Sequence, residues 1–120
     1  MKTIGLLGVP MDLGQERRGV DMGPSAIRYA GVEQCLLDLN YAVTDYGDIV
    51  VQGRCPSQVG DENSKNLTSV VEANLSVKES VLRMLSDGVF PLILGGDHSI
   101  SIGTLAAIND NKKNIGVIWY

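Results

Sequence analysis

Short apolar runs alternate with helical patterns along this chain, and this alternation constrains the fold more than any other feature. The runs at residues 4–9, 89–94 and 115–120 are apolar almost throughout, as strands buried on both faces are, and residues 41–51 contain alternating apolar positions. Parallel strands need a crossover connection, which is usually a helix. The sequence therefore predicts an α/β fold in which helices cover a parallel sheet of four strands.

Local signals mark the first and last predicted helices. Pro24 stands at the first position of a helix that continues through Tyr29 and is expected to break or bend at Gly31, before a leucine-rich stretch. The last predicted helix covers residues 99–108. A polar turn over residues 109–114 is expected to lead from it into the last strand.

The clearest helical pattern covers residues 66–87. Apolar residues recur there at steps of three and four, with a polar gap at Asn74. Gly88 stands where a glycine commonly ends a helix. The following strand contains Pro91, which is awkward in a central strand and indicates a first residue or an irregular start. Residues 52–65 are polar, with Gly and Pro, and predict a loop.

Glycine-rich loops follow two of the predicted strands. One covers residues 10–18, and the other is the turn Gly95-Gly96-Asp97-His98. In open α/β sheets ligands bind beyond the carboxyl ends of the strands. We therefore expect both loops at one rim of the sheet.

His98 is the only histidine in the chain and is the candidate metal ligand of this rim. A neutral imidazole binds Mn, Fe, Zn or Ni, and carboxylates complete the sites of harder ions. Asp97 can be a ligand, or it can orient His98 through a hydrogen bond. Alternatively Asp97 caps the next helix and His98 is merely exposed, and the dipeptide alone does not decide. A phosphate loop is less favoured, because no Lys follows Ser99 and Asp97 would repel a phosphate.

A purely structural role is open for the charged loop at residues 14–24 and for the terminal aromatic residues. Arg17, Arg18 and the acids beside them form either a solvated segment or ion pairs that fix a rim loop or a subunit contact. Trp119 and Tyr120 are interpreted as packing in the core or at a strand end, rather than as a binding platform.

The composition excludes several classes of partner. The net charge of −4 argues against nucleic acid and anionic membranes, and no run is long enough to cross a bilayer.

No signal peptide is recognised, so a cytoplasmic protein of one domain is predicted. Cys35 and Cys55 are interpreted as reduced thiols, Cys35 in a helix core and Cys55 in a loop, with a disulfide between them as the less favoured alternative.

Three stretches of the chain resemble the arginase family, particularly its bacterial type: GVPMDLG at 8–14, RRGVDMGPSAIRYAG at 17–31 and LGGDHSISIG at 94–103. The GGDHS stretch is shared by the wider ureohydrolase family, including agmatinases, whereas RGVDMGP is more similar to arginases. The resemblance runs through residues 1–120. It implies the N-terminal part of a single three-layer α/β domain, with helices on both faces of the sheet.

The resemblance implies a function. Arginases hydrolyse L-arginine to L-ornithine and urea at a binuclear manganese centre, and they usually assemble as homo-trimers or hexamers. The position that matches the first metal-binding histidine of the family is His98, and the resemblance gives Asp97 a supporting role. Agmatinase or another guanidino-substrate hydrolase is the alternative within the same chemistry. A non-catalytic truncated module is an alternative of another class, and a nucleotide-binding protein ranks well below both.

The sequence also departs from the family pattern. In arginases the strand that matches residues 115–120 leads into an Asp-x-His-x-Asp motif with further metal ligands, and this chain stops before it. One histidine cannot hold two manganese ions, so we expect the 120-residue chain alone to be inactive. We also expect the incomplete sheet to leave an open edge, with poor stability, self-association or a partner chain as the result.

Overall fold

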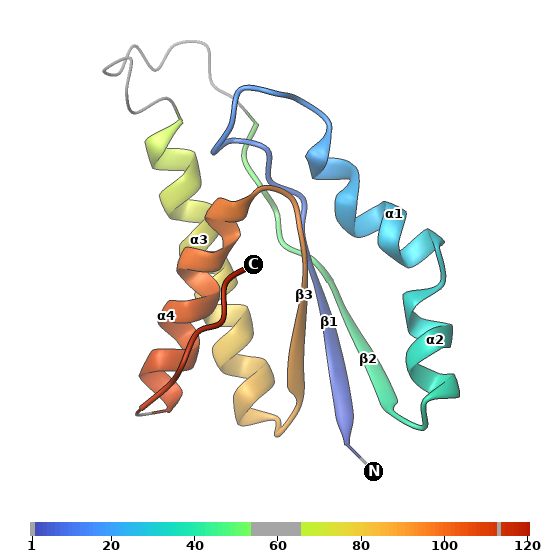
Figure 1. Ribbon diagram of the computed structural model, residues 1–120. Helices are drawn as coiled ribbons and strands as arrows, with labels where there is room; N and C mark the ends of the chain where they lie inside the picture. The colour runs from blue at the N-terminus through green and yellow to red at the C-terminus, as the bar shows by residue number, and fades with distance from the viewer. Residues whose placement is uncertain (1, 54–65, 113) are drawn as a thin grey trace.

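The computed structural model describes residues 2–53, 66–112 and 114–120, and these form a three-stranded parallel sheet with helices (Figure 1). The central strand is β1 (Thr3–Val9), which pairs with β2 (Ala42–Asp48) on one side and with β3 (Phe90–Gly95) on the other. The predicted α/β class with a parallel sheet is confirmed.

Helices cover both faces of the sheet. α1 and α2 lie on one side, and α3 and α4 lie on the other (Figure 1). The helices are α1 (Gly23–Tyr29), α2 (Val32–Asp38), α3 (Leu67–Ser86) and α4 (Ser101–Asn111), with short 3-10 helices η1 (Val20–Met22) and η2 (His98–Ile100). The arrangement is therefore three-layered, as predicted. None of the helices in the described ranges is long and apolar enough to cross a membrane.

The predicted helix boundaries follow local backbone chemistry. Pro24 lies in the first turn of α1, and Gly31 separates α1 from α2 with a φ of +90°. Gly88 follows α3 with a φ of +72°, and the N–H of Val89 donates to the carbonyl of Met84 at 3.0 Å. This pattern closes the last turn of a helix and favours glycine at the left-handed position. These boundary predictions are confirmed.

The core lies mainly between β1 and α3. Leu7 and Val9 of β1 pack in one buried cluster with Val77, Val81 and Met84 of α3. The alternate β1 residues, Ile4 and Leu6, are buried as well. Because successive side chains of a strand point to opposite faces, β1 is covered on both faces, which explains its nearly unbroken apolar sequence.

The predicted fourth strand is wrong. Residues 115–120 pair with no strand of the described sheet, and Figure 1 shows them running back along α4, which itself continues to Asn111 through part of the predicted turn. Ile118 is 79% exposed. Apolar, β-favouring residues form a strand only where a neighbouring strand accepts their backbone hydrogen bonds, and this segment has no such neighbour here.

In the described sheet, whose strand order is β2-β1-β3, β3 is an edge strand. Pro91 is its second residue, not its first. Proline is tolerated in an edge strand, because only one side of such a strand needs a complete set of backbone donors. The observed position resolves the difficulty that the sequence posed for Pro91.

The prediction that Cys35 lies in a helix core is also wrong. Cys35 is in α2 as a free thiol, but it is exposed. The reason is that α2 has only seven residues and none of them is buried. Cys55 and residues 54–65 of the predicted loop lie outside the described residues.

An ion-pair cluster fastens α1 to the end of β2. Arg28 donates through Nε and Nη2 to the two carboxylate oxygens of Asp45 at 2.6 and 2.9 Å, and through Nη1 to Asp48 at 2.5 Å. A Cβ at Gly8 would lie only 1.7 Å from Oδ1 of Asp48, so this glycine makes room for the cluster. The hydrogen bonds from Arg28 hold the pKa of Asp45 below its ordinary value.

We predict that Arg28→Ala lowers the free energy of unfolding by about 1 kcal/mol at neutral pH, because the pairs are partly exposed. A depressed folded-state pKa stabilises above the ordinary pKa of aspartate and loses this effect as the pH falls through the folded value. The difference from wild type should therefore shrink below about pH 4. Urea titrations at several pH values measure it, with Arg28→Lys as the charge-preserving control, which should recover part of the loss. A difference that persists undiminished in acid would contradict this account.

Candidate functional site

The two glycine-rich loops meet at the carboxyl ends of β1 and β3, as the sequence predicted. The backbone N–H of Asp97 donates to the carbonyl of Met11 at 2.8 Å. A Cβ at Gly96 would lie 2.4 Å from that same carbonyl oxygen and 2.7 Å from the carbonyl oxygen of Val9. Such distances are too short for any side chain, so the loops approach this closely only because residue 96 is glycine.

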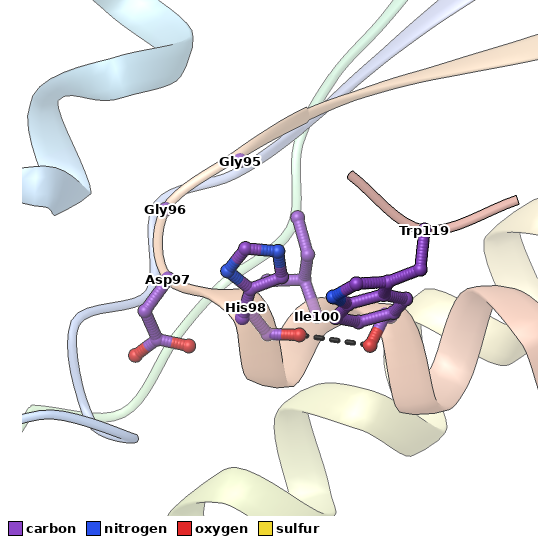
Figure 2. Close-up of a pocket in the computed structure, with 7 residues that line it drawn as sticks. Gly95, Gly96, Asp97, His98, Ile100 and Trp119 are labelled. Atoms are coloured by element: carbon purple, nitrogen blue, oxygen red, sulfur yellow. Dashed lines mark hydrogen bonds between the residues drawn. The ribbon is translucent and has the colours of Figure 1, made fainter.

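The carboxylate of Asp97 holds this junction together. It is 8% exposed and accepts hydrogen bonds from the N–H of Gly14 at 2.7 Å, from the N–H of Ser99 at 2.9 Å and from the hydroxyl of Ser99. Asp97 is thus the N-cap of η2, which confirms the capping interpretation. Its carboxylate points away from the His98 imidazole (Figure 2), and none of its hydrogen bonds within the described structure reaches that ring.

His98 is the first residue of η2 and is exposed at the rim. Its carbonyl accepts a hydrogen bond from the hydroxyl of Ser101 at 2.8 Å (Figure 2). Its ring stacks on the indole of Trp119, with centroids 4.9 Å apart and an angle of 28° between the planes. The imidazole is therefore held at the rim by backbone contacts and one aromatic neighbour.

The interpretation of Trp119 and Tyr120 as core or strand-end packing is wrong. Trp119 is 61% exposed and lies on His98, and Tyr120 is fully exposed. Both outcomes follow from the unpaired state of residues 115–120, because only pairing to the sheet would fix which way their side chains point. No signal in the sequence links Trp119 to the histidine.

A cavity of about 400 Å³ opens beside the imidazole (Figure 2). Its lining comes from the end of β3, from η2 and from the C-terminal segment: Gly95, Gly96, Asp97, His98, Ile100, Ser101 and Trp119. A Cβ at Gly95 would lie 2.2 Å from the Cδ1 atom of Ile100, so the second glycine of the turn makes room for η2. The cavity thus exists where both glycines let the chain turn sharply.

The charged loop at residues 14–24 is attached to the same rim by an ion pair. Nε of Arg18 lies 2.5 Å from Oδ2 of Asp12, whose side chain is buried while that of Arg18 is largely exposed. The ion-pair alternative is therefore confirmed for Arg18. Asp12 was not singled out from the sequence, although it belongs to the GVPMDLG stretch, and a buried acid needs a partner of this kind.

The rim residues do not by themselves form a binuclear manganese site. Within the described part of the chain, no three His, Cys, Asp or Glu side chains are grouped so that they could hold a metal ion. His98 offers an imidazole, but both oxygens of Asp97 already accept hydrogen bonds. Manganese favours a coordination shell rich in carboxylates, and the described residues offer one nitrogen.

Comparison with known proteins identifies the family. The model of the arginase family matches residues 2–120. The chain is 52% identical to an arginase of Bacillus subtilis, over 99% of this chain and 40% of that protein. The chain belongs to the arginase family.

Solved structures of similar proteins share this fold. The arginase of Bacillus caldovelox superimposes with a TM-score of 0.94 at 52% identity, over 100% of this chain and 40% of that one. A formiminoglutamase variant of Trypanosoma cruzi, solved with Mn²⁺, gives a TM-score of 0.63 at 26% identity, over 89% and 35% of the two chains. The chain spans 40% of the length of the Bacillus arginases that it matches.

The family stretches have a physical explanation at this rim. Two of them, GVPMDLG and LGGDHS, are the loops that Asp97 joins through Gly14. A Cβ at Gly14 would lie 2.9 Å from the Ser99 hydroxyl and 3.1 Å from an Asp97 oxygen. A side chain at position 14 would therefore press on both groups, and glycine lets its own N–H approach the carboxylate without displacing them.

We predict that Asp97→Ala lowers the free energy of unfolding by about 2 to 3 kcal/mol, because it leaves backbone donors of Gly14 and Ser99 without their acceptor. Asp97→Asn keeps one carbonyl oxygen and should lose less, and Ser99→Ala should lose least because it removes only the hydroxyl donor. Urea unfolding followed by circular dichroism measures all three variants. Equal losses for Asp97→Ala and Ser99→Ala would show that the bond to Gly14 adds nothing.

Proposed function

We propose that this chain forms part of an enzyme that hydrolyses L-arginine to L-ornithine and urea. The observation that carries the proposal is the rim itself, where the two family loops meet and present His98 beside a cavity at the carboxyl end of β3. The similar proteins of Bacillus subtilis and Bacillus caldovelox are arginases, which favours arginine over agmatine as the substrate. The identity to them over the whole chain supports a shared chemistry.

We propose His98 as a ligand of manganese in that enzyme. It is exposed at the rim, and its backbone is fixed on both sides by hydrogen bonds of Asp97 and Ser101. Manganese is favoured because a structurally similar formiminoglutamase was solved with Mn²⁺. Two such ions activate water as a nucleophile when their coordination shells are complete. We propose that Asp97 holds the loop through its hydrogen bonds to Gly14 and Ser99 and does not bind the metal.

We further propose that the enzyme is cytoplasmic and assembles as a homo-trimer or hexamer. The free thiol of Cys35 is typical of a reducing compartment. The oligomer is proposed from the family resemblance, and the net charge of −4 gives no reason to add nucleic acid or membranes as partners.

The 120-residue chain alone should release no urea. It offers one imidazole, which is too little to hold two manganese ions. The measurement is Mn²⁺-dependent urea release with L-arginine and agmatine in parallel, for wild type and for His98→Ala. Urea from arginine with the wild type but not with His98→Ala would contradict the proposed inactivity.

A chimera tests the role of His98 in arginine hydrolysis. In it, this chain replaces the matching N-terminal 40% of the Bacillus caldovelox arginase. We expect urea release from arginine, and a loss of at least about 100-fold with His98→Ala together with a lower manganese content, since even residues that only support a metal ligand cost 10- to 100-fold. The exposed Tyr29→Ala of α1 is the control and should change neither. A His98→Ala chimera with full activity and full manganese content would disprove the role as a ligand.

A further inference from the structure

Asn74 is the polar residue that interrupts the apolar face of α3, and both the oxygen and the nitrogen of its side-chain amide form hydrogen bonds. It is 6% exposed. Its Oδ1 accepts the backbone N–H of Gly103 at 2.7 Å, and its Nδ2 donates to the carbonyl of Val70, one turn back in α3, at 2.9 Å. A buried amide is retained at low cost only when it is hydrogen-bonded in this way. The polar residue that interrupts the apolar pattern of α3 therefore links α3 to α4.

The link reaches the first turn of α4. Backbone N–H groups in the first turn of a helix commonly need an acceptor from outside the helix. Ile100, which precedes α4, makes no side-chain capping bond, and Gly103 is the third residue of the helix. Asn74 thus supplies from α3 an acceptor that a capping side chain would otherwise supply.

Gly103 allows the two helices to touch at this point. A Cβ at position 103 would lie 2.3 Å from the backbone oxygen of Asn74 and 3.0 Å from Cβ of Val77. Only glycine permits such an approach between backbones. The hydrogen bond and the close contact therefore fix α4 on α3 at one place.

His98 lies between two bonds of this kind. Before it, the carboxylate of Asp97 binds the N–H of Gly14, and after it, the amide of Asn74 binds the N–H of Gly103. Between them the backbone of η2 is held by the hydroxyl of Ser101 on the carbonyl of His98. The segment that carries the imidazole is thus fastened at both ends to segments distant in sequence.

We propose that Asn74 is a positioning residue for His98. Its amide fixes where η2 joins α4, and so it sets where the imidazole stands at the rim. The proposal deepens the proposed function and rests on it for its purpose, since a fixed imidazole matters most if it binds a metal.

The chain offers a direct readout of that orientation. It contains one histidine and one tryptophan, so the imidazole C–H resonances in an NMR spectrum belong to His98 alone. Stacking on Trp119 at 4.9 Å places these protons in the shielding region of the indole and shifts them upfield. A change in the position of η2 alters the stack and moves the resonances towards those of a free imidazole.

The test compares three changes at Asn74 with one matched change elsewhere. Asn74→Ala and Asn74→Ser both remove the acceptor for Gly103, but serine can still donate to the carbonyl of Val70. Both should lose most of the upfield shift. Asn74→Asp keeps an acceptor for the helix N-terminus and should keep the shift, although it loses stability. Val81→Ala, a buried change two turns further along α3, should lower stability and leave the shift as it is.

The outcomes separate a positioning role from a merely structural one. An unchanged His98 shift in folded Asn74→Ala or Asn74→Ser would overturn the proposal, and so would the same loss of shift in Val81→Ala. Failure of both acceptor-deleting variants to fold would also overturn it, because the effect would then not be confined to the junction. The His98→Ala chimera tests the proposed function separately. If that chimera keeps its full activity and manganese content while Asn74→Ala still moves the His98 resonances, the positioning role stands and the metal-ligand role fails.

Discussion

The buried carboxylate of Asp97 is the interaction on which the rim depends. A carboxylate removed from water is costly unless several donors surround it, and here the donors come from both loops. One donor, the N–H of Gly14, lies 83 residues away in sequence. The loop after β1 and the loop after β3 therefore close on one another through this side chain and through the N–H of Asp97, which donates to the carbonyl of Met11. Both the cavity and the place of His98 follow from that closure.

Glycines make these contacts possible by bringing backbones together. Gly14 lets its N–H reach the carboxylate, Gly96 lets the two loops cross, and Gly103 lets α4 touch α3. At each of these positions a Cβ would stand closer than 3 Å to a neighbouring atom. A glycine in these stretches therefore marks a place where two distant parts of the backbone meet, not a flexible point. This is why short glycine-containing stretches carried so much of the family resemblance.

Local signals predicted most of the fold, and contacts between distant segments account for the errors. Pro24 and Gly88 mark helix ends because their preferences act on their own backbone, and the apolar run of β1 shows directly that both its faces are covered. The run at residues 115–120 carries an equally strong strand pattern, but a strand also needs a neighbour. The stack of Trp119 on His98 and the bond of Asn74 to Gly103 join segments that no periodicity connects.

The candidate site holds the proposed ligand His98 in place by contacts within the protein. The carboxylates of Asp12 and Asp97 at this rim already bind Arg18 and backbone donors, so the group that they leave available is the imidazole of His98. Metal sites work best when their ligands are held in place by surrounding hydrogen bonds before the ion arrives. Asp97 and Asn74 provide such support on either side of His98, one through a loop and the other through a helix. In the enzyme that we propose, this part of the arginase fold then contributes one firmly positioned nitrogen, and the strength of metal binding comes from the carboxylates that join it.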